Sequence, residues 1–204
     1  MFDPSTLSPE DLLLVVAGIG LSFPRDLYQP HDGQKRFHAA PQRIRALFPG
    51  NRFGKTTAMA VEAMDVLRSR RAQVVWVAPE FSQFEQLRPQ LEAQVWDHGH
   101  RWNGQDNLYS WPNGATLKVF SNESDWAKIQ GINPDLVCID EECKSALYRE
   151  LRARSAGRKQ TRYVIAATAT GGASWMETEI YQPWLKHHAD MGMSEAEAAR
   201  AQLH

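Results

Sequence analysis

The strongest constraint on the fold of this chain is a glycine-rich loop at residues 48–57, Phe-Pro-Gly-Asn-Arg-Phe-Gly-Lys-Thr-Thr. It follows residues 45–48, a short apolar run that predicts a buried strand. It precedes residues 55–69, where the spacing of apolar side chains predicts a helix. A loop of this kind between a strand and a helix is the context in which backbone N–H groups and the helix N-terminus bind phosphate. We therefore expect a phosphate-binding loop here.

The residue types of the loop suit a nucleoside triphosphate. Gly50 and Gly54 allow backbone N–H groups to converge on phosphate oxygens, Lys55 would reach the β- and γ-phosphates, and the Thr56 hydroxyl would bind Mg²⁺. The general pattern G-x-x-x-x-G-K-[ST] has glycine where this chain has Pro49. The alternative is a Gly-Lys-Thr helix start that binds no ligand.

The chain after the loop alternates between predicted strands and helices. Apolar runs predict strands at residues 73–78, 135–139 and 162–167, and helices are expected at 82–96, with a kink or break at Pro89, and at 143–154. Residues 108–111 and 115–120 flank Pro112-Asn113-Gly114, a hairpin signal. This pattern predicts an α/β fold with a mainly parallel central sheet flanked by helices and with a β-hairpin insertion.

The two ends of the chain are expected to lie outside the main domain. Residues 8–21 predict a short helix, residues 22–42 a loop or linker into the main fold, and residues 193–203 a helix rich in Ala and Glu. We therefore divide the chain into an N-terminal helix and linker (1–30), a phosphate-loop domain (31–184) and a C-terminal helical tail (185–204).

Charge and composition exclude some classes of protein. The chain has 23 basic and 24 acidic residues, so its net charge is −1 and any nucleic-acid contact must come from a local patch. The longest apolar run, residues 12–21, is ten residues long, whereas a membrane span needs about 20. Two cysteines provide no disulfide framework. We expect a protein of a reducing compartment with no membrane partner.

Three acidic residues end the strand predicted at 135–139. In P-loop enzymes the first acid supports Mg²⁺ and the next orients or activates the attacking water. We assign Asp140 to the metal and Glu141 to the general base, with Glu142 as the less favoured base. The alternative is that these acids only cap the helix that follows. A strand at 73–78 lies between the loop and this motif, which indicates the motor branch of P-loop proteins, defined by an additional strand and a catalytic Glu.

Four segments in this order resemble the ATPase domain of a tailed-phage large terminase, the motor that packages double-stranded DNA into proheads. They are Gln34 with its neighbours Pro30, Phe37 and His38, the loop at 49–56, the acidic strand at 137–142, and Thr168-Ala169-Thr170. The resemblance covers about residues 28 to 184. It implies ATP and Mg²⁺ as cofactors. It implies double-stranded DNA, the portal protein and the small terminase subunit as partners, a homo-oligomeric ring, and the host cytoplasm as location.

The resemblance also implies roles for individual residues. Gln34 would read adenine through its side-chain amide, Arg52 would contact the γ-phosphate, and Thr168, Ala169 and Thr170 would couple hydrolysis to movement. The alternatives are that Gln34 is an ordinary exposed glutamine and that Thr168-Ala169-Thr170 is only the capped end of a strand. The predicted catalytic residues are Glu141, Arg52 and Lys55, and the predicted ATP-binding residues are Gln34, Gly50, Asn51, Arg52, Phe53, Gly54, Lys55, Thr56 and Thr57.

Complete large terminases add a nuclease domain with an acidic, metal-binding cluster. The acids after Thr170 are scattered here, so we expect no nuclease activity from this chain and interpret it as an ATPase domain or a separate subunit. These acids are Glu177, Glu179, Asp190, Glu195 and Glu197.

A basic segment follows the acidic strand. Arg152, Arg154 and Arg158 are candidates for contact with DNA or with a neighbouring subunit, and a solvated helix face is the alternative. Two other functions stay open for the whole chain: a helicase-like DNA-dependent ATPase, and a nucleotide-dependent assembly module without turnover.

Overall fold

The computed structural model describes residues 28–50, 52–96, 99–124, 129, 131–157, 160–168 and 174–194. The helix expected at residues 8–21 lies outside these ranges, as does the tail helix expected at 193–203 apart from its first two residues. None of the helices within the described ranges is long and apolar enough to span a bilayer.

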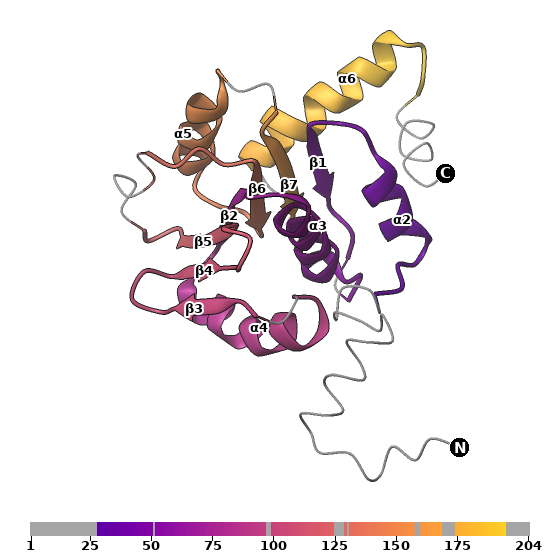
Figure 1. The fold of residues 1–204 in the computed structure, drawn as a ribbon. Coiled ribbons are helices and arrows are strands. Elements are labelled where there is room, and N and C mark those ends of the chain that lie inside the picture. The colour runs from indigo at the N-terminus through magenta and orange to yellow at the C-terminus, as the bar shows by residue number, and fades with distance from the viewer. Residues whose placement is uncertain are drawn as a thin grey trace, which may run out of the picture.

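A seven-stranded sheet in the order β1-β7-β6-β2-β5-β4-β3 forms the centre of the molecule (Figure 1). Its strands are β1 (Ile44–Leu47), β2 (Gln73–Ala78), β3 (Arg101–Asn103), β4 (Leu108–Ser110), β5 (Thr116–Ser121), β6 (Leu136–Asp140) and β7 (Arg162–Ala166). Neighbours from β1 to β5 are parallel, and β4 and β3 add an antiparallel edge. This agrees with the predicted mainly parallel sheet with a hairpin insertion.

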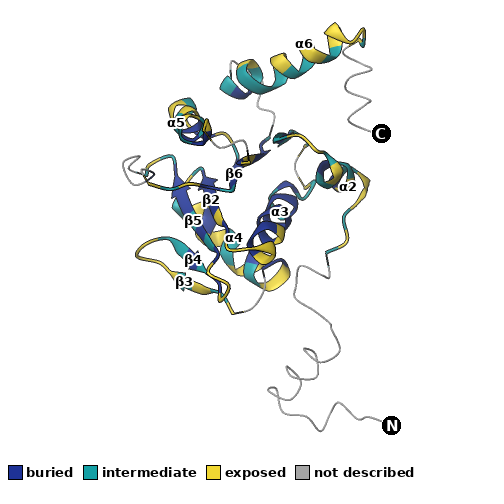
Figure 2. Ribbon diagram, turned by 45° about the horizontal axis from the view of Figure 1, so that its top comes forward, coloured by how far each residue is buried: buried dark blue, intermediate teal, exposed yellow. Residues whose placement is uncertain are grey.

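Helices cover both faces of the sheet (Figure 2). Helices α3 (Lys55–Ser69) and α4 (Phe81–Gln94) pack on one face and α5 (Ser145–Ser155) on the other. The described chain also forms α2 (Asp32–Ala39), the π-helix η4 (Glu177–Tyr181) and α6 (Gln182–Asp190). Side chains of β2 alternate between two cores: Val74 and Trp76 pack with α3 and α4, whereas Val75 and Val77 pack with α5. Burial on both faces explains why β2 reads as a continuous apolar run.

Helix α2 corrects the expectation of a loop or linker over residues 22–42. The sequence did not predict this helix because its eight residues include one large apolar side chain, Phe37, which is too little for a recognisable apolar repeat. Tertiary contacts hold it instead. The Arg45 guanidinium of β1 donates to the Phe37 carbonyl at 3.0 Å, and His38 Nδ1 lies 2.6 Å from a carboxylate oxygen of Glu62 on α3.

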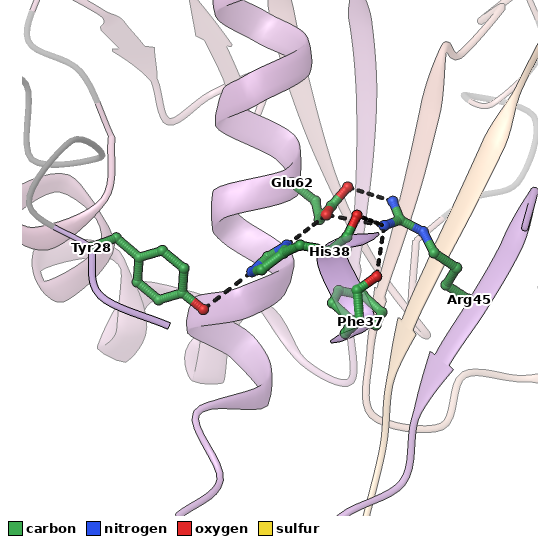
Figure 3. Close-up of polar contacts among 5 residues, drawn as sticks. All are labelled: Tyr28, Phe37, His38, Arg45 and Glu62. Atoms are coloured by element: carbon green, nitrogen blue, oxygen red, sulfur yellow. Dashed lines mark hydrogen bonds and ion pairs between the residues drawn. The ribbon is translucent and has the colours of Figure 1, made fainter. Parts of the chain in front are cut away.

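A buried charge network joins α2, β1 and α3 (Figure 3). Arg45 and Glu62 are 5% and 6% exposed, and the guanidinium contacts both carboxylate oxygens. Burial raises the pKa of Glu62, but hydrogen bonds from His38 and Arg45 outweigh it and hold that pKa below its ordinary value. The Tyr28 hydroxyl lies 3.2 Å from His38 Nε2 and extends the network. A buried charge of this kind is tolerated because the two opposite charges are paired.

Three further features differ from the expectations. Helix α4 is not divided at Pro89, and the Arg88 side chain beside it bridges Glu85 at 3.0 Å and Glu92 at 3.3 Å. The sequence does not predict strand β3, because three residues are too few for a periodic signal. It does not predict η4 either, and α6 begins at Gln182, three residues before the helical tail expected at 185–204.

The predicted hairpin turn is anchored to α3 through one side chain. Asn113 Nδ2 donates to the Leu67 carbonyl at 2.7 Å, and its Oδ1 accepts from the Ala115 amide at 2.9 Å. Gly114 follows with a φ of +80°, a conformation that favours glycine. Asn113 therefore shapes the turn and also ties the β4–β5 hairpin to the phosphate-loop helix.

Replacement of Asn113 by alanine is expected to lower the free energy of unfolding by about 1–2 kcal/mol, because it removes both hydrogen bonds. Urea unfolding measures the loss. Asn113→Ser is the matched control: its hydroxyl can still accept from the Ala115 amide but does not reach the Leu67 carbonyl, so its loss should be intermediate. An Asn113→Ala variant as stable as the wild type would contradict the role given to this side chain.

Candidate functional site

The loop, the acids and Thr168 of the predicted site meet at one edge of the sheet. Strand β7 lies between β1 and β6, and all three strands run parallel. Their carboxyl ends therefore bring the loop after β1, the acids after β6 and Thr168 after β7 to the same place. This is the edge at which open α/β sheets bind ligands. The strand inserted between the two motif-bearing strands is β7. Strand β2 (residues 73–78), which lies between the loop and the acidic motif in the sequence, pairs with β6 on its other side.

The glycine-rich loop has the backbone conformation of an anion-binding cradle. Arg52 and Gly54 have φ angles of +67° and +79°, with Phe53 between them outside the left-handed region. Alternation of this kind turns successive N–H groups toward one side. Gly50 and Arg52 are exposed, Phe53 and Thr57 are partly buried, and Asn51 lies outside the described residues.

Lys55, the first residue of α3, lies in the centre of the site. It is 8% exposed, and its Nζ is 3.3 Å from the Pro49 carbonyl and 3.0 Å from Thr168 Oγ1. A Glu141 carboxylate oxygen lies 3.9 Å away. The departure from the family pattern at Pro49 removes an N–H group from the loop, but the carbonyl of this residue still contacts the lysine.

Asp140 and Thr56 form the candidate metal site. Thr56 Oγ1 donates to Asp140 Oδ1 at 3.0 Å. Burial raises the pKa of Asp140 to about 7, with a further increase from Glu141, although Thr56 and Lys55 lower it. One carboxylate and one hydroxyl suit Mg²⁺, which takes few protein ligands and completes its shell with water and phosphate oxygens. The described part of the chain has no cluster of three His, Cys, Asp or Glu side chains placed to bind a metal.

The two glutamates after Asp140 point to different partners. Glu141 has a φ of +64°, and its carboxylate accepts from the Thr168 amide at 2.7 Å and from Thr168 Oγ1 at 2.9 Å. Glu142 instead accepts from Ser174 Oγ at 2.6 Å. Only Glu141 of this pair lies beside Lys55, a placement that favours it over Glu142 as the base.

Thr168 connects the lysine with the glutamate. Its hydroxyl contacts Lys55 Nζ and donates to Glu141, and its amide donates to the second carboxylate oxygen of Glu141. These contacts favour a role for Thr168 in the site over the alternative that it only caps the end of a strand. Ala169 and Thr170, the other residues of the predicted coupling motif, lie outside the described residues.

Gln34 is buried at 5% exposure, which excludes the alternative of an ordinary exposed glutamine. Its Nε2 lies 3.4 Å from the Phe53 carbonyl and 3.3 Å from the Gly54 carbonyl. His31, which the sequence did not single out, also reaches the loop, because its Nε2 lies 3.1 Å from the Phe53 carbonyl. A position at the N-cap of α2, three residues before Gln34, is the only sequence signal for His31.

The described arginines of the basic segment have partners within the chain. The Arg152 guanidinium lies over the rings of Tyr148 and Tyr163, 5.9 Å and 5.5 Å from their centroids. Arg154 pairs with Glu150 at 2.5 Å. Arg158 lies outside the described residues. These contacts favour a structural role for Arg152 and Arg154, and contact with DNA or a subunit stays a prediction.

Solved structures share this fold. The ATPase domain of the large terminase of Thermus phage P74-26 superimposes with a TM-score of 0.62 at 17% identity, over 88% of this chain and 75% of that one. The large terminase of another thermophilic bacteriophage gives 0.63 at 16% identity, over 86% of this chain and 50% of that one. The same protein in complex with ADP gives 0.58 at 14% identity, over 89% and 50%. This chain thus matches half the length of that second terminase.

No curated protein sequence matches this chain. A family model does: the N-terminal region of the terminase large subunit, T4likevirus-type, matches residues 47–203, which is more than half of the chain. Together with the convergence of the loop, the acids and Thr168 at one sheet edge, this match shows that the chain belongs to the large terminase family.

Proposed function

We propose that this chain is a Mg²⁺-dependent ATP hydrolase whose turnover drives packaging of double-stranded DNA into a viral prohead. Membership of the large terminase family supports the proposal, as does the fold shared with a terminase solved in complex with ADP. The observation that carries it is the arrangement of Lys55, Asp140 with Thr56, and Glu141 at one sheet edge beside a phosphate loop. A site that only bound nucleotide would not need the glutamate beside the lysine.

The loop and Lys55 would hold the triphosphate. Backbone N–H groups between Arg52 and Thr56 would donate to phosphate oxygens, and the N-terminus of α3 would add its positive potential. Lys55 is already desolvated and held between the Pro49 carbonyl and Thr168, so its ammonium group needs little reorganisation to reach the β- and γ-phosphates.

Thr56 and Asp140 would hold Mg²⁺, which when bound neutralises the charge that develops on the β- and γ-phosphate oxygens. The hydroxyl and the carboxylate are already 3.0 Å apart, so both oxygens are gathered before ligand binding. Burial destabilises the ionised form of Asp140, as its raised pKa indicates, and a bound cation would stabilise that form.

Glu141 would orient the attacking water and accept its proton. Two hydrogen bonds from Thr168 fix its carboxylate, and the same Thr168 contacts Lys55. Thr168 therefore shares one contact with the phosphate-binding lysine and two with the base. A change at the γ-phosphate would reach the segment after Thr168 through these contacts, as expected of a coupling motif. Arg52, exposed at the loop, would contact the γ-phosphate.

The proposed partners are double-stranded DNA, the portal protein and the small terminase subunit, with a homo-oligomeric ring in the host cytoplasm. Family membership supports them. We also propose that this chain has no nuclease activity. Among the acids after Thr170, Glu179 pairs with Arg149 at 2.7 Å and Glu177 accepts from Gln182 at 2.6 Å, an arrangement unlike a shared metal site.

Phosphate release from ATP, with Mg²⁺ or with EDTA, tests the proposal, first with the chain alone and then with portal protein and linear duplex DNA. We expect hydrolysis that EDTA stops and that assembly on the portal increases. Nucleotide binding without hydrolysis, even with portal and DNA, would favour the assembly module. Strand separation by the isolated chain would favour the helicase-like alternative, and failure to bind nucleotide would overturn the proposal.

A further inference from the structure

The N-terminal end of α2 is bound to the backbone of the phosphate loop. Gln34 Nε2 donates to the Phe53 and Gly54 carbonyls at 3.4 Å and 3.3 Å, and the His31 ring nitrogen lies 3.1 Å from the Phe53 carbonyl. The acceptor of Gln34 is used as well, because its Oε1 accepts from the His31 amide at 3.2 Å. Both ends of the Gln34 amide therefore have protein partners.

These contacts, together with the Ala58 amide that donates to the Gly54 carbonyl at 2.9 Å, fix the direction of two amide N–H groups. A peptide group is planar and trans, so the N–H that follows a carbonyl points the opposite way. With the carbonyls of Phe53 and Gly54 turned toward α2, the N–H groups of Gly54 and Lys55 are turned away from it. These are the last amides of the loop and the first of α3, which a phosphate-binding loop directs at its ligand.

Close packing prevents α2 and the loop from moving closer together, and the hydrogen bonds oppose their separation. A Cβ atom on Gly33 would lie 2.7 Å from the Phe53 ring, and one on Gly54 would lie 2.7 Å from Gln34 Nε2. The His31 and Phe53 rings also meet edge to face, with centroids 4.5 Å apart. Both glycines allow an approach that no side chain could make, which indicates a built contact between the helix and the loop.

The other end of α2 is fixed to the elements on either side of the loop (Figure 3). Arg45, on the strand before the loop, donates to the Phe37 carbonyl, and Glu62, on the helix after the loop, contacts His38. Arg45 and Glu62 are in turn paired with each other in the core. Helix α2 is thus held to β1 and α3 at one end and presents His31 and Gln34 to the loop at the other.

We propose that His31 and Gln34 are positioning residues that hold the phosphate loop in its binding conformation, whatever base the ligand carries. The inference rests on the proposed function, because it concerns the same site, but it gives Gln34 a different task from reading adenine. A residue that reads adenine discriminates between bases. A residue that orients loop amides acts on the phosphate chain, which all nucleoside triphosphates share.

Binding of ATP, GTP and inorganic tripolyphosphate to Gln34→Ala and His31→Ala, measured by calorimetry with Mg²⁺, tests the proposal. Loss of these hydrogen bonds should weaken all three ligands by the same factor, about tenfold for Gln34→Ala. Gly33→Ala should give the same uniform loss by pushing Phe53 out of place. Lys35→Ala is the matched control, because this exposed side chain of α2 pairs with Asp32 and should leave binding unchanged.

The unfolding midpoint of each variant, measured in parallel, separates loss of affinity from loss of folded protein. Weaker ATP binding by Gln34→Ala with unchanged GTP and tripolyphosphate binding would overturn the inference in favour of adenine reading. Wild-type affinity of both variants for all three ligands would overturn it too. A wild-type chain that binds none of the ligands would overturn the proposed function, and this inference with it.

Discussion

Replacement of Glu141 by glutamine is expected to lower the rate of ATP hydrolysis by about 10³-fold, because it removes the proton acceptor. ATP affinity should change little, since glutamine retains a side-chain oxygen that can accept from the Thr168 amide. Single-turnover phosphate release measures the rate, and equilibrium binding of ATP shows whether the site stays intact. An unchanged rate would eliminate Glu141 as the base.

Glu142→Gln is the matched control for this experiment. The two glutamates are neighbours in sequence, but Glu142 binds Ser174 and is not placed beside Lys55. We therefore expect this variant to keep the chemical step close to the wild-type rate. The reverse result, with hydrolysis lost in Glu142→Gln and retained in Glu141→Gln, would exchange the two assignments.

Replacement of Asp140 by asparagine is expected to stabilise the free protein at alkaline pH while it abolishes Mg²⁺-dependent hydrolysis. Burial raises the pKa of Asp140 from 3.8 in a model peptide to about 7 in the fold. The native state therefore holds this proton more tightly than the unfolded chain does, and ionisation of Asp140 costs stability. The cost is small below pH 4, grows as the pH rises from 4 to 7, and is complete above 7.

The shift corresponds to a gain for Asp140→Asn of up to about 4 kcal/mol at pH 8 and about 1 kcal/mol at pH 4.5. Asparagine can still accept from Thr56, so the local hydrogen bond is kept. Denaturant unfolding of both proteins at the two pH values, without nucleotide or divalent cations, measures the gain. A stability difference that does not depend on pH would show that the fold does not raise the pKa of Asp140.

The sequence determined the class of fold and the place of the candidate site in it. The loop at 48–57 and the apolar runs at 73–78, 135–139 and 162–167 predicted strands and a helix that the structure confirms within one or two residues. These signals are local: strands buried on both faces are apolar throughout, and the glycine-rich loop needs its residue types at fixed spacing. Parallel order then brings the carboxyl ends of the strands together.

Tertiary structure decided what the local pattern does not encode. Helix α2 has one large apolar side chain, Phe37, and is held by Arg45 and Glu62, which come from other elements. The different directions of Glu141 and Glu142 depend on Thr168 and Ser174, which lie 27 and 32 residues further along the chain. Two adjacent carboxylates look alike in a sequence, because their roles are set by partners that only folding brings within hydrogen-bonding distance.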